Sequence, residues 1–178
     1  MKLYAIRHGR TDWNVRKIMQ GRTDTPLNEE GIAQAYETKE ALKPYTFDHV
    51  FASPQKRAWQ TAEIVTEGRG LTLIPADALR ERSYGEFEGR GRDVFNYLDF
   101  WAYGKNLKYE EAENIRDFFG RVWPFLDELK TNYPQERVLL VTHSGVIRAI
   151  ECYAHGIMAD DELGLWLPKN CSVHEYDL

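Results

Sequence analysis

Val138 to Val141 is a run of four aliphatic residues, and a strand of this kind has few places in a folded domain. Because it is apolar on both faces, it belongs in a parallel sheet that helices cover on both sides. Polar residues follow in Thr142-His143-Ser144-Gly145, and a helical pattern then runs from 146 to 155. The chain begins in the same order, with an apolar strand at 2–6 that ends at Arg7-His8-Gly9. The two units predict an α/β fold with a mostly parallel sheet.

The rest of the chain alternates in the same way between short apolar runs and helical patterns. We expect further strands at 49–52, 71–75 and 171–176, and further helices at 29–43, from Pro54 onward, and at 113–130. Helices on both faces of one sheet give a three-layer α/β/α sandwich. No linker rich in Gly, Ser or Pro divides the chain, so residues 1–178 are expected to form a single domain.

Local signals set the expected ends of these helices. Asn28 is a suitable N-cap for the first long helix, and Ser53 is a suitable cap for the helix that Pro54 opens. Pro124 removes a backbone N–H donor in the middle of the last long pattern. We therefore expect a kink or a helix boundary near Trp123.

Charge is distributed unevenly along the chain. The net charge of −5 disfavours a nucleic-acid-binding protein, because such binding depends on a basic surface that neutralises phosphates. The first 22 residues nevertheless hold six basic residues against Asp12 alone, a charge of +5. Most of the six are arginines, whose planar guanidinium groups bind phosphate in bidentate fashion. This end of the chain favours a small anionic ligand.

Several other classes are disfavoured. No apolar stretch approaches the ~18 residues of a membrane span, and no export signal is visible at the start. Cys152 and Cys171 have no Cys-x-x-Cys spacing, so we expect both to be reduced core residues of a cytoplasmic protein. His49, His155 and His174 have no carboxylate or cysteine partners at ligand spacing, so we expect no metal site.

Polar residues follow three of the expected strands. His8 follows the first strand, the segment 53–57 follows the second, and His143 follows the strand at 138–141. Ligands of parallel α/β sheets bind beyond the carboxyl ends of the strands. We therefore expect these residues to meet at one edge of the sheet, with Glu81 in a neighbouring loop.

Four motifs occur in a familiar order: Arg7-His8-Gly9, Ser53-Pro54-Gln55-Lys56-Arg57-Ala58, Leu79-Arg80-Glu81 and Thr142-His143-Ser144-Gly145. Together they resemble the histidine phosphatase superfamily, which includes the cofactor-dependent phosphoglycerate mutases. The resemblance covers nearly the whole chain. It implies a phosphoglycerate mutase-like α/β/α fold and phosphoryl transfer through a phosphorylated histidine.

The resemblance also implies a role for each matching residue. His8 is expected to be the nucleophile and Glu81 the proton donor. The phosphoryl group is expected to be surrounded by Arg7, Arg57 and His143. The substrate-binding residues expected from the early loop and the second histidine motif are Asn14, Gln20, Gly21, Thr23 and Ser144.

Elementary chemistry supports these roles. Attack on phosphorus requires a neutral imidazole, and nearby guanidinium groups together with His143 should lower the pKa of His8 toward that form. Its other ring nitrogen must then carry the proton, most simply donated to a backbone carbonyl in the early loop. Arg7, Arg57 and His143 can stabilise the transferring phosphoryl group, so no metal ion and no cofactor are expected.

The motifs leave the phosphoryl acceptor open. The short segment between Glu81 and His143 favours a phosphatase that acts on a small phosphorylated metabolite, either a sugar phosphate or a phosphorylated acid. A phosphoglycerate mutase, in which a second hydroxyl takes the phosphoryl group, is the alternative. A module that binds a phosphorylated partner without turnover is a third reading, against which the intact His8, Glu81 and His143 argue.

Three features fall outside this scheme. Ala112-Glu113-Asn114 departs from the Gly-Glu-Ser pattern of many members of the superfamily, and Arg90-Gly91-Arg92 offers an extra anionic contact. The aromatic residues between 97 and 109 fit either a core or a lid over the substrate. The sequence leaves both readings open.

Overall fold

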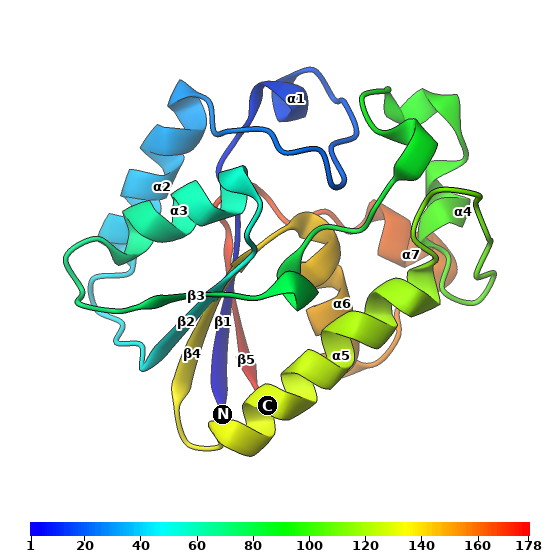
Figure 1. Cartoon of the computed structure of the whole chain (residues 1–178). Coiled ribbons are helices and arrows are strands. Elements are labelled where there is room, and N and C mark those ends of the chain that lie inside the picture. The colour runs from blue at the N-terminus through cyan, green and yellow to red at the C-terminus, as the bar shows by residue number, and fades with distance from the viewer.

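All 178 residues are described by the computed structural model, in which five strands form one sheet (Figure 1). The strands are β1 (Lys2–Arg7), β2 (His49–Ala52), β3 (Leu73–Pro75), β4 (Arg137–Thr142) and β5 (Val173–Asp177), in the spatial order β3-β2-β4-β1-β5. β4 runs parallel to β1 and β2, and β2 runs parallel to β3. β5, at the edge, is antiparallel to β1. The mostly parallel sheet is confirmed.

Helices cover both faces of the sheet. The longer ones are α2 (Glu29–Ala41) and α3 (Lys56–Thr66) on one face, and α5 (Ile115–Asn132) and α6 (Ser144–His155) on the other (Figure 1). The shorter helices are α1 (Asp12–Val15), α4 (Tyr97–Trp101) and α7 (Asp160–Leu165), and α4 packs against α7. Single 3-10 turns occur at 77–79, 85–87 and 92–94. The α/β/α sandwich is confirmed.

The side chains of β1 alternate between two separate hydrophobic cores. Leu3 and Ala5 belong to the core that includes α5 and α6, whereas Tyr4 and Ile6 belong to the core that includes α3 and Leu42, the residue after α2. Because the strand is buried on both faces, a slip of one residue in its pairing would exchange the two sets. The register of the sheet therefore fixes which residues emerge at its carboxyl edge.

One helix start differs from the expectation. α3 begins at Lys56 rather than at Pro54, so Ser53 is not its cap. The Ser53 hydroxyl instead lies 2.8 Å from Nε2 of His143, because the tertiary contact competes for the same side chain. Asn28, by contrast, caps α2 as predicted, since its side chain accepts a backbone N–H of the first turn.

α5 passes through Pro124 without a boundary near Trp123. A proline in a helix interior costs about 3 kcal/mol. The buried face of α5 carries six large hydrophobic residues, Ile115, Phe118, Phe119, Val122, Leu126 and Leu129. Burial of one such side chain contributes roughly 1.5–3 kcal/mol, so packing outweighs the proline.

Both cysteines are free, as expected. Cys152 is buried in the core beside α5 and α6, but Cys171 is only partly buried and has a φ of 58°. Cys171 is therefore not a core residue, because β5 begins two residues later, at Val173, and Cys171 lies in the loop before it. None of the helices combines the length and the apolar composition that a membrane span requires.

Candidate active site

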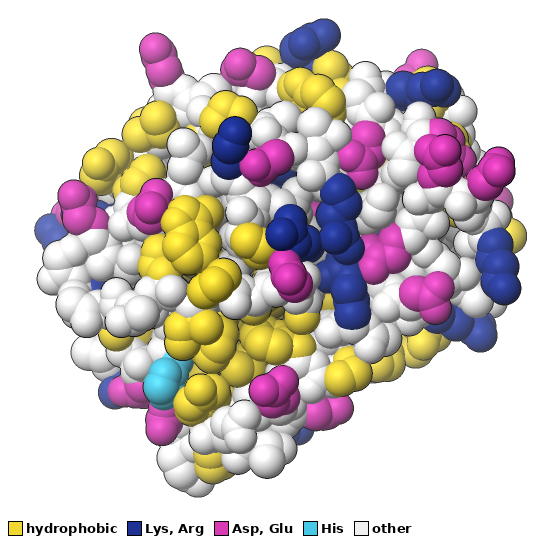
Figure 2. Space-filling view, in the orientation of Figure 1, with side chains coloured by type: hydrophobic (Ala, Val, Ile, Leu, Met, Phe, Trp, Pro, Cys, Tyr) yellow, Lys and Arg dark blue, Asp and Glu magenta, His cyan; other side chains and the backbone are white.

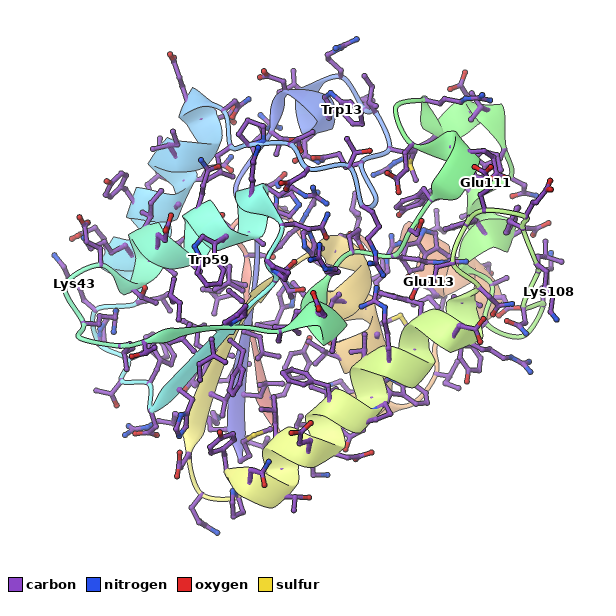
Figure 3. The ribbon with its side chains drawn as sticks, in the orientation of Figure 1. Trp13, Lys43, Trp59, Lys108, Glu111 and Glu113 are labelled. Carbon is purple, nitrogen blue, oxygen red and sulfur yellow. The ribbon has the colours of Figure 1, made fainter.

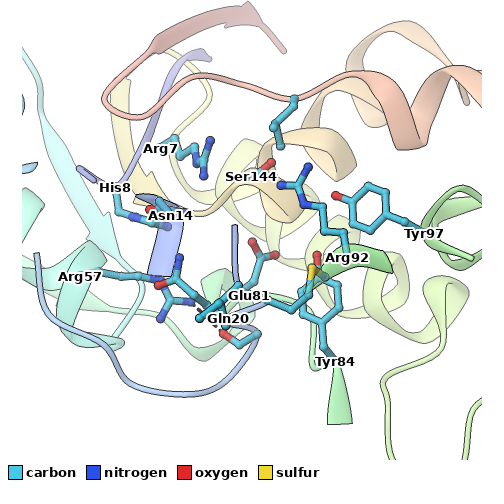
Figure 4. Close-up of a pocket in the computed structure, with 14 residues that line it drawn as sticks. Arg7, His8, Asn14, Gln20, Arg57, Glu81, Tyr84, Arg92, Tyr97 and Ser144 are labelled. Atoms are coloured by element: carbon cyan, nitrogen blue, oxygen red, sulfur yellow. Dashed lines mark hydrogen bonds between the residues drawn. The ribbon is translucent and has the colours of Figure 1, made fainter. Parts of the chain in front are cut away.

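A cavity opens where β1 and β4 end (Figure 4). Its lining comes from segments that are far apart in the sequence: Arg7, His8, Asn14, Ile18, Met19, Gln20, Gly21, Arg57, Glu81, Tyr84, Arg92, Tyr97, Ser144 and Leu167. All the predicted site residues except Thr23 and His143 belong to this lining. The convergence expected at the sheet edge is therefore present.

His8 follows β1 directly and is buried, with 3% of its surface exposed. Its Nδ1 lies 2.7 Å from the carbonyl oxygen of Gly9. Because a carbonyl oxygen only accepts, Nδ1 carries the proton and donates this bond. Nε2 then keeps its lone pair free for the cavity. This bond supplies the backbone partner in the early loop that the sequence led us to expect.

The pKa of His8 lies well below its ordinary value of 6.5. Burial is the main cause, because it disfavours the charged ring. The positive charges of Arg57 and Arg7 lower the pKa further, against the opposing effect of the hydrogen bond to Gly9. At neutral pH the His8 ring is therefore uncharged, which is the form that a nucleophile requires.

His143 follows β4 and lies beside His8, with the two ring centroids 5.2 Å apart. Its Nε2 pairs with the Ser53 hydroxyl at 2.8 Å, while its buried Nδ1 has no partner in the protein. Burial lowers the pKa of His143 well below 6.5, and the charge of Arg57 adds to this effect. His143 lies outside the cavity lining, and its Nδ1 is a buried nitrogen without a protein partner beside the nucleophile.

The guanidinium groups of Arg7 and Arg57 are fixed by backbone carbonyls. Arg7 Nη1 donates to Pro168 at 2.6 Å, and Arg57 donates from Nη1 to Thr23 and from Nη2 to Gly21, both at 2.8 Å. Burial lowers the pKa of each arginine to about 10, so both stay charged at neutral pH. The buried Nε atom of each has no partner. Two anchored positive charges with unused donors form a site for an anion.

Further donors come from Asn14 and Ser144. Asn14 Oδ1 accepts hydrogen bonds from the backbone N–H of Thr11 and from Asn170, which leaves its amide NH2 group free to donate. Ser144 begins α6, where the first backbone N–H groups have no helical acceptor, and its buried Oγ has no partner. Gln20 is different, because its Oε1 accepts from two threonine hydroxyls and holds the early loop together.

Glu81 enters the cavity from the loop after the 3-10 turn at 77–79 and is 7% exposed. Its Oε1 accepts the N–H of Arg82 at 2.9 Å, and its Oε2 accepts the N–H of Gly145 at 3.2 Å. A Cβ on Gly145 would overlap Oε1 of Glu81 and would lie 2.8 Å from the Trp101 ring. The carboxyl group is therefore packed against the first turn of α6, directly after the second histidine.

The backbone of Glu81 is held from several directions. Gln55 Oε1 accepts its N–H at 2.8 Å, and Arg22 and Arg121 donate to its carbonyl at 2.7 and 3.1 Å. Arg121 also pairs at 2.7 Å with Glu113, which lies just before the start of α5 (Figure 3). In Figure 2, basic side chains gather near the middle of this same face of the molecule. These contacts fix the loop that carries the acid.

Thr23 does not line the cavity. Its N–H and its hydroxyl both donate to Oε2 of Glu88, at 2.9 and 2.6 Å, and its carbonyl accepts from Arg57. Glu88 Oε1 accepts the N–H groups of Arg22 and Tyr84. Thr23 therefore helps to position Arg57, and Glu88 ties the early loop to the segment that follows the acid.

Sequence reasoning did not assign five lining residues to the site: Ile18, Met19, Tyr84, Tyr97 and Leu167. Aromatic density marks the region around Tyr97, but the sequence does not show which rings face inward. The structure divides them, since Phe100 and Trp101 are buried in the core whereas Tyr97 lines the cavity. Leu167 lies in the loop after α7 and carries no signal in the sequence.

An uncharged buried histidine, charged arginines without ion-pair partners and a packed carboxyl group, all at the carboxyl edge of an α/β sheet, form a phosphoryl-transfer site. The sequence profile of the histidine phosphatase superfamily (branch 1) matches residues 3–178. The chain belongs to this superfamily, as the four motifs predicted.

Known members resemble the chain in sequence and in fold. The "Uncharacterized phosphatase PhoE" of Bacillus subtilis (strain 168) is 37% identical over 145 residues, which cover 82% of this chain and 72% of that protein. The "Probable phosphoglycerate mutase GpmB" of Erwinia tasmaniensis is 28% identical over 183 residues, 99% of this chain and 85% of that protein. The crystal structure of the alpha-ribazole phosphatase from Shigella flexneri matches with a TM-score of 0.85 and 27% identity, and covers 100% of this chain and 91% of the other. Two of these three proteins are named phosphatases, the class expected from the sequence, and the third is named a phosphoglycerate mutase.

Proposed function

We propose that this protein hydrolyses small phosphomonoesters through a covalent phosphohistidine at His8, without a metal ion. The observation that carries the proposal is the Nδ1–H of His8 donating to Gly9, which leaves Nε2 free in a pocket lined by Arg7 and Arg57. Residues 1–178 act as one catalytic domain in this scheme.

In the first step, Nε2 of His8 attacks phosphorus and the bond between phosphorus and the ester oxygen breaks. The Glu81 carboxyl group gives its proton to the departing alcohol oxygen. Negative charge on the transferring group is stabilised by Arg7, Arg57 and His143, each of which contributes about 3 kcal/mol to a step of this kind.

In the second step, a water molecule attacks phosphorus and the bond from phosphorus to Nε2 breaks. The Glu81 carboxylate takes a proton from this water, so one residue serves as acid and then as base. Phosphate leaves, and His8 returns to its neutral form. The Gly9 carbonyl keeps the ring in one tautomer and one orientation during both steps.

A mutase is the second candidate, and the relative named as a phosphoglycerate mutase favours it. It shares the first step, after which a substrate hydroxyl rather than water takes the phosphoryl group. The two candidates separate when interconversion of 2- and 3-phosphoglycerate, with and without a bisphosphorylated primer, is measured beside phosphate release. Phosphate release from several esters without interconversion supports the hydrolase, and primer-dependent interconversion without net release supports the mutase.

Trapping the intermediate tests the proposal itself. Wild-type protein mixed with a ³²P-labelled ester and quenched within milliseconds should carry acid-labile label, and His8→Ala should carry none. His155→Ala is the matched control, because that side chain is exposed at the end of α6, and it should label like the wild type. Label retained in His8→Ala, or binding of phosphate and vanadate without release from any ester, would refute the proposal. The cytoplasmic location stays a prediction.

A further inference from the structure

The cavity has a second basic group that the proposed chemistry does not use. Arg92 and Tyr97 lie across the cavity from Arg7 and His8 (Figure 4). The Arg92 guanidinium packs over the Tyr97 ring, 4.8 Å from its centroid, and makes no hydrogen bond or ion pair with the protein. Its five N–H donors are therefore available to a bound molecule.

The proton of the Tyr97 hydroxyl also has no acceptor in the protein. Its oxygen accepts a hydrogen bond from Arg148 Nη1 at 3.2 Å. Arg148 is fully buried, and its other donors are bound to the carbonyls of Trp166 and Gly164. Because an arginine side chain never accepts, the phenolic proton must point elsewhere, and no protein atom accepts it. The free side of this hydroxyl is the cavity that Tyr97 lines.

The charge balance of the cavity adds a third observation. Three arginines line it, Arg7, Arg57 and Arg92, against Glu81 as the only acidic residue. In the proposed function Arg7 and Arg57 bind the phosphoryl group on His8, which leaves Arg92, an exposed side chain without an ion pair, as the remaining positive charge of the cavity. Burial raises the pKa of Tyr97, but the nearby charges of Arg148 and Arg92 outweigh it and leave this pKa below its ordinary value, as expected for a hydroxyl in a cationic environment.

We propose that Arg92 and Tyr97 bind a carboxylate on the alcohol portion of the substrate, so that the preferred substrates are phosphorylated hydroxy acids. One guanidinium fork and one hydroxyl match the two oxygens of a carboxylate. A second phosphate would need a donor set as rich as the one around His8. The proposal rests on the proposed function, since it takes the ester phosphate to lie at His8.

The remaining lining suits a short carbon skeleton between the two anionic groups. Ile18, Met19 and Leu167 contribute the apolar part of the wall. A small skeleton that contacts these side chains can place its phosphate at Arg7 and its carboxylate at Arg92 at the same time. Sugar phosphates without a carboxylate would leave the exposed Arg92 guanidinium hydrated and would gain no charge-assisted contact with it, which makes their affinity lower than that of the acids.

Pairs of esters that differ by one carboxylate test this inference. 3-Phosphoglycerate and glycerol 1-phosphate form one pair, and phosphoserine and phosphoethanolamine form the other. For wild-type protein, kcat/KM should be about 10- to 100-fold higher for the acid of each pair, the range expected for a charge-assisted hydrogen-bonded contact. Arg92→Gln should remove most of this preference, and Arg92→Lys should restore part of it. Tyr97→Phe should reduce it about 5-fold, as expected for one lost hydrogen bond.

Arg90→Gln is the matched control, because Arg90 is an exposed arginine two residues away that does not line the cavity. It should keep the wild-type preference. Equal kcat/KM within each pair, or a preference that survives Arg92→Gln, would overturn the inference. A stronger preference for 2,3-bisphosphoglycerate than for either acid, lost in Arg92→Gln, would assign the site to a second phosphate and would overturn it too.

The test also separates the inference from the proposed function. Titration calorimetry with His8→Ala measures the affinity for each acid and for the ester of the same pair that lacks the carboxylate, without any turnover. A failure to release phosphate from any ester contradicts the proposed function alone. Equal affinities within each pair contradict the carboxylate site alone.

Discussion

Gly145→Ala is expected to weaken the acid step selectively. The added Cβ would overlap Oε1 of Glu81 and would lie 2.8 Å from the ring of Trp101, which is fully buried and cannot retreat. The Glu81 carboxyl group must then move by about 1 Å, and a misplacement of that size costs about 100-fold in rate. This loss is within the roughly 10²- to 10⁴-fold that a general acid supplies.

The assay compares two esters with different leaving groups. Nitrophenolate departs without a proton, whereas the alkoxide of glycerol 1-phosphate needs one. For Gly145→Ala, kcat/KM should fall about 100-fold for glycerol 1-phosphate and less than about 5-fold for nitrophenyl phosphate. The same pattern should appear in Glu81→Gln, because both substitutions act on one carboxyl group.

Gly120→Ala is the matched control, because Gly120 lies on the exposed face of α5 and an added Cβ meets nothing within 4 Å. It should leave both activities unchanged and should raise stability by up to about 1 kcal/mol, since alanine has the higher helix propensity. If Gly145→Ala slowed both esters equally, its effect would not pass through Glu81. If it slowed neither, the packing argument would be wrong.

Three further predictions follow from the same contacts. EDTA should leave phosphate release unchanged, because the guanidinium groups carry the charge stabilisation; a loss restored by a metal ion would contradict this. Burial, reinforced by Arg57, lowers the pKa of His8 and His143, so the unfolded chain gains protons below about pH 6.5 that the folded protein refuses. The free energy of unfolding should therefore be constant with respect to these two rings above that pH, and below it should fall by up to about 1.4 kcal/mol per pH unit for each ring. In urea titrations at several pH values, His8→Asn should lose the part of this pH dependence that His8 contributes. Glu88→Gln should destabilise the protein by about 1–3 kcal/mol in denaturant unfolding, because Glu88 accepts several N–H and O–H donors of the early loop; an unchanged midpoint would contradict that role.

Strands and their connections were predictable because the sheet is buried on both faces. No polar residue alternates with the apolar residues from Val138 to Val141, which indicates a strand buried on both faces. In a parallel sheet, the residues that follow each strand then lie at the same edge. The sequence pattern therefore predicts that His8 and His143 meet at this edge. The tautomer of His8 was also foreseeable, since a nucleophilic Nε2 requires a donor bond from Nδ1.

Tertiary competition explains what could not be predicted. Ser53 has the local features of a helix cap, yet its hydroxyl contacts His143, 90 residues away. Pro124 signals a helix break, yet the buried face of α5 continues across it. Tyr97 lines the cavity from α4, which packs against α7, and Leu167 lines it from the loop after α7; this long-range packing leaves no periodic trace in the sequence.

The position of the phosphoryl group on the imidazole ring tests the central claim most directly. Protein phosphorylated by substrate, denatured in base and examined by ³¹P NMR and peptide mass spectrometry, should carry phosphate on Nε2 of His8. Because Nδ1 of the same ring is occupied by its bond to Gly9, none should appear there. Phosphate on Nδ1, on His143, or on no histidine at all would contradict the account.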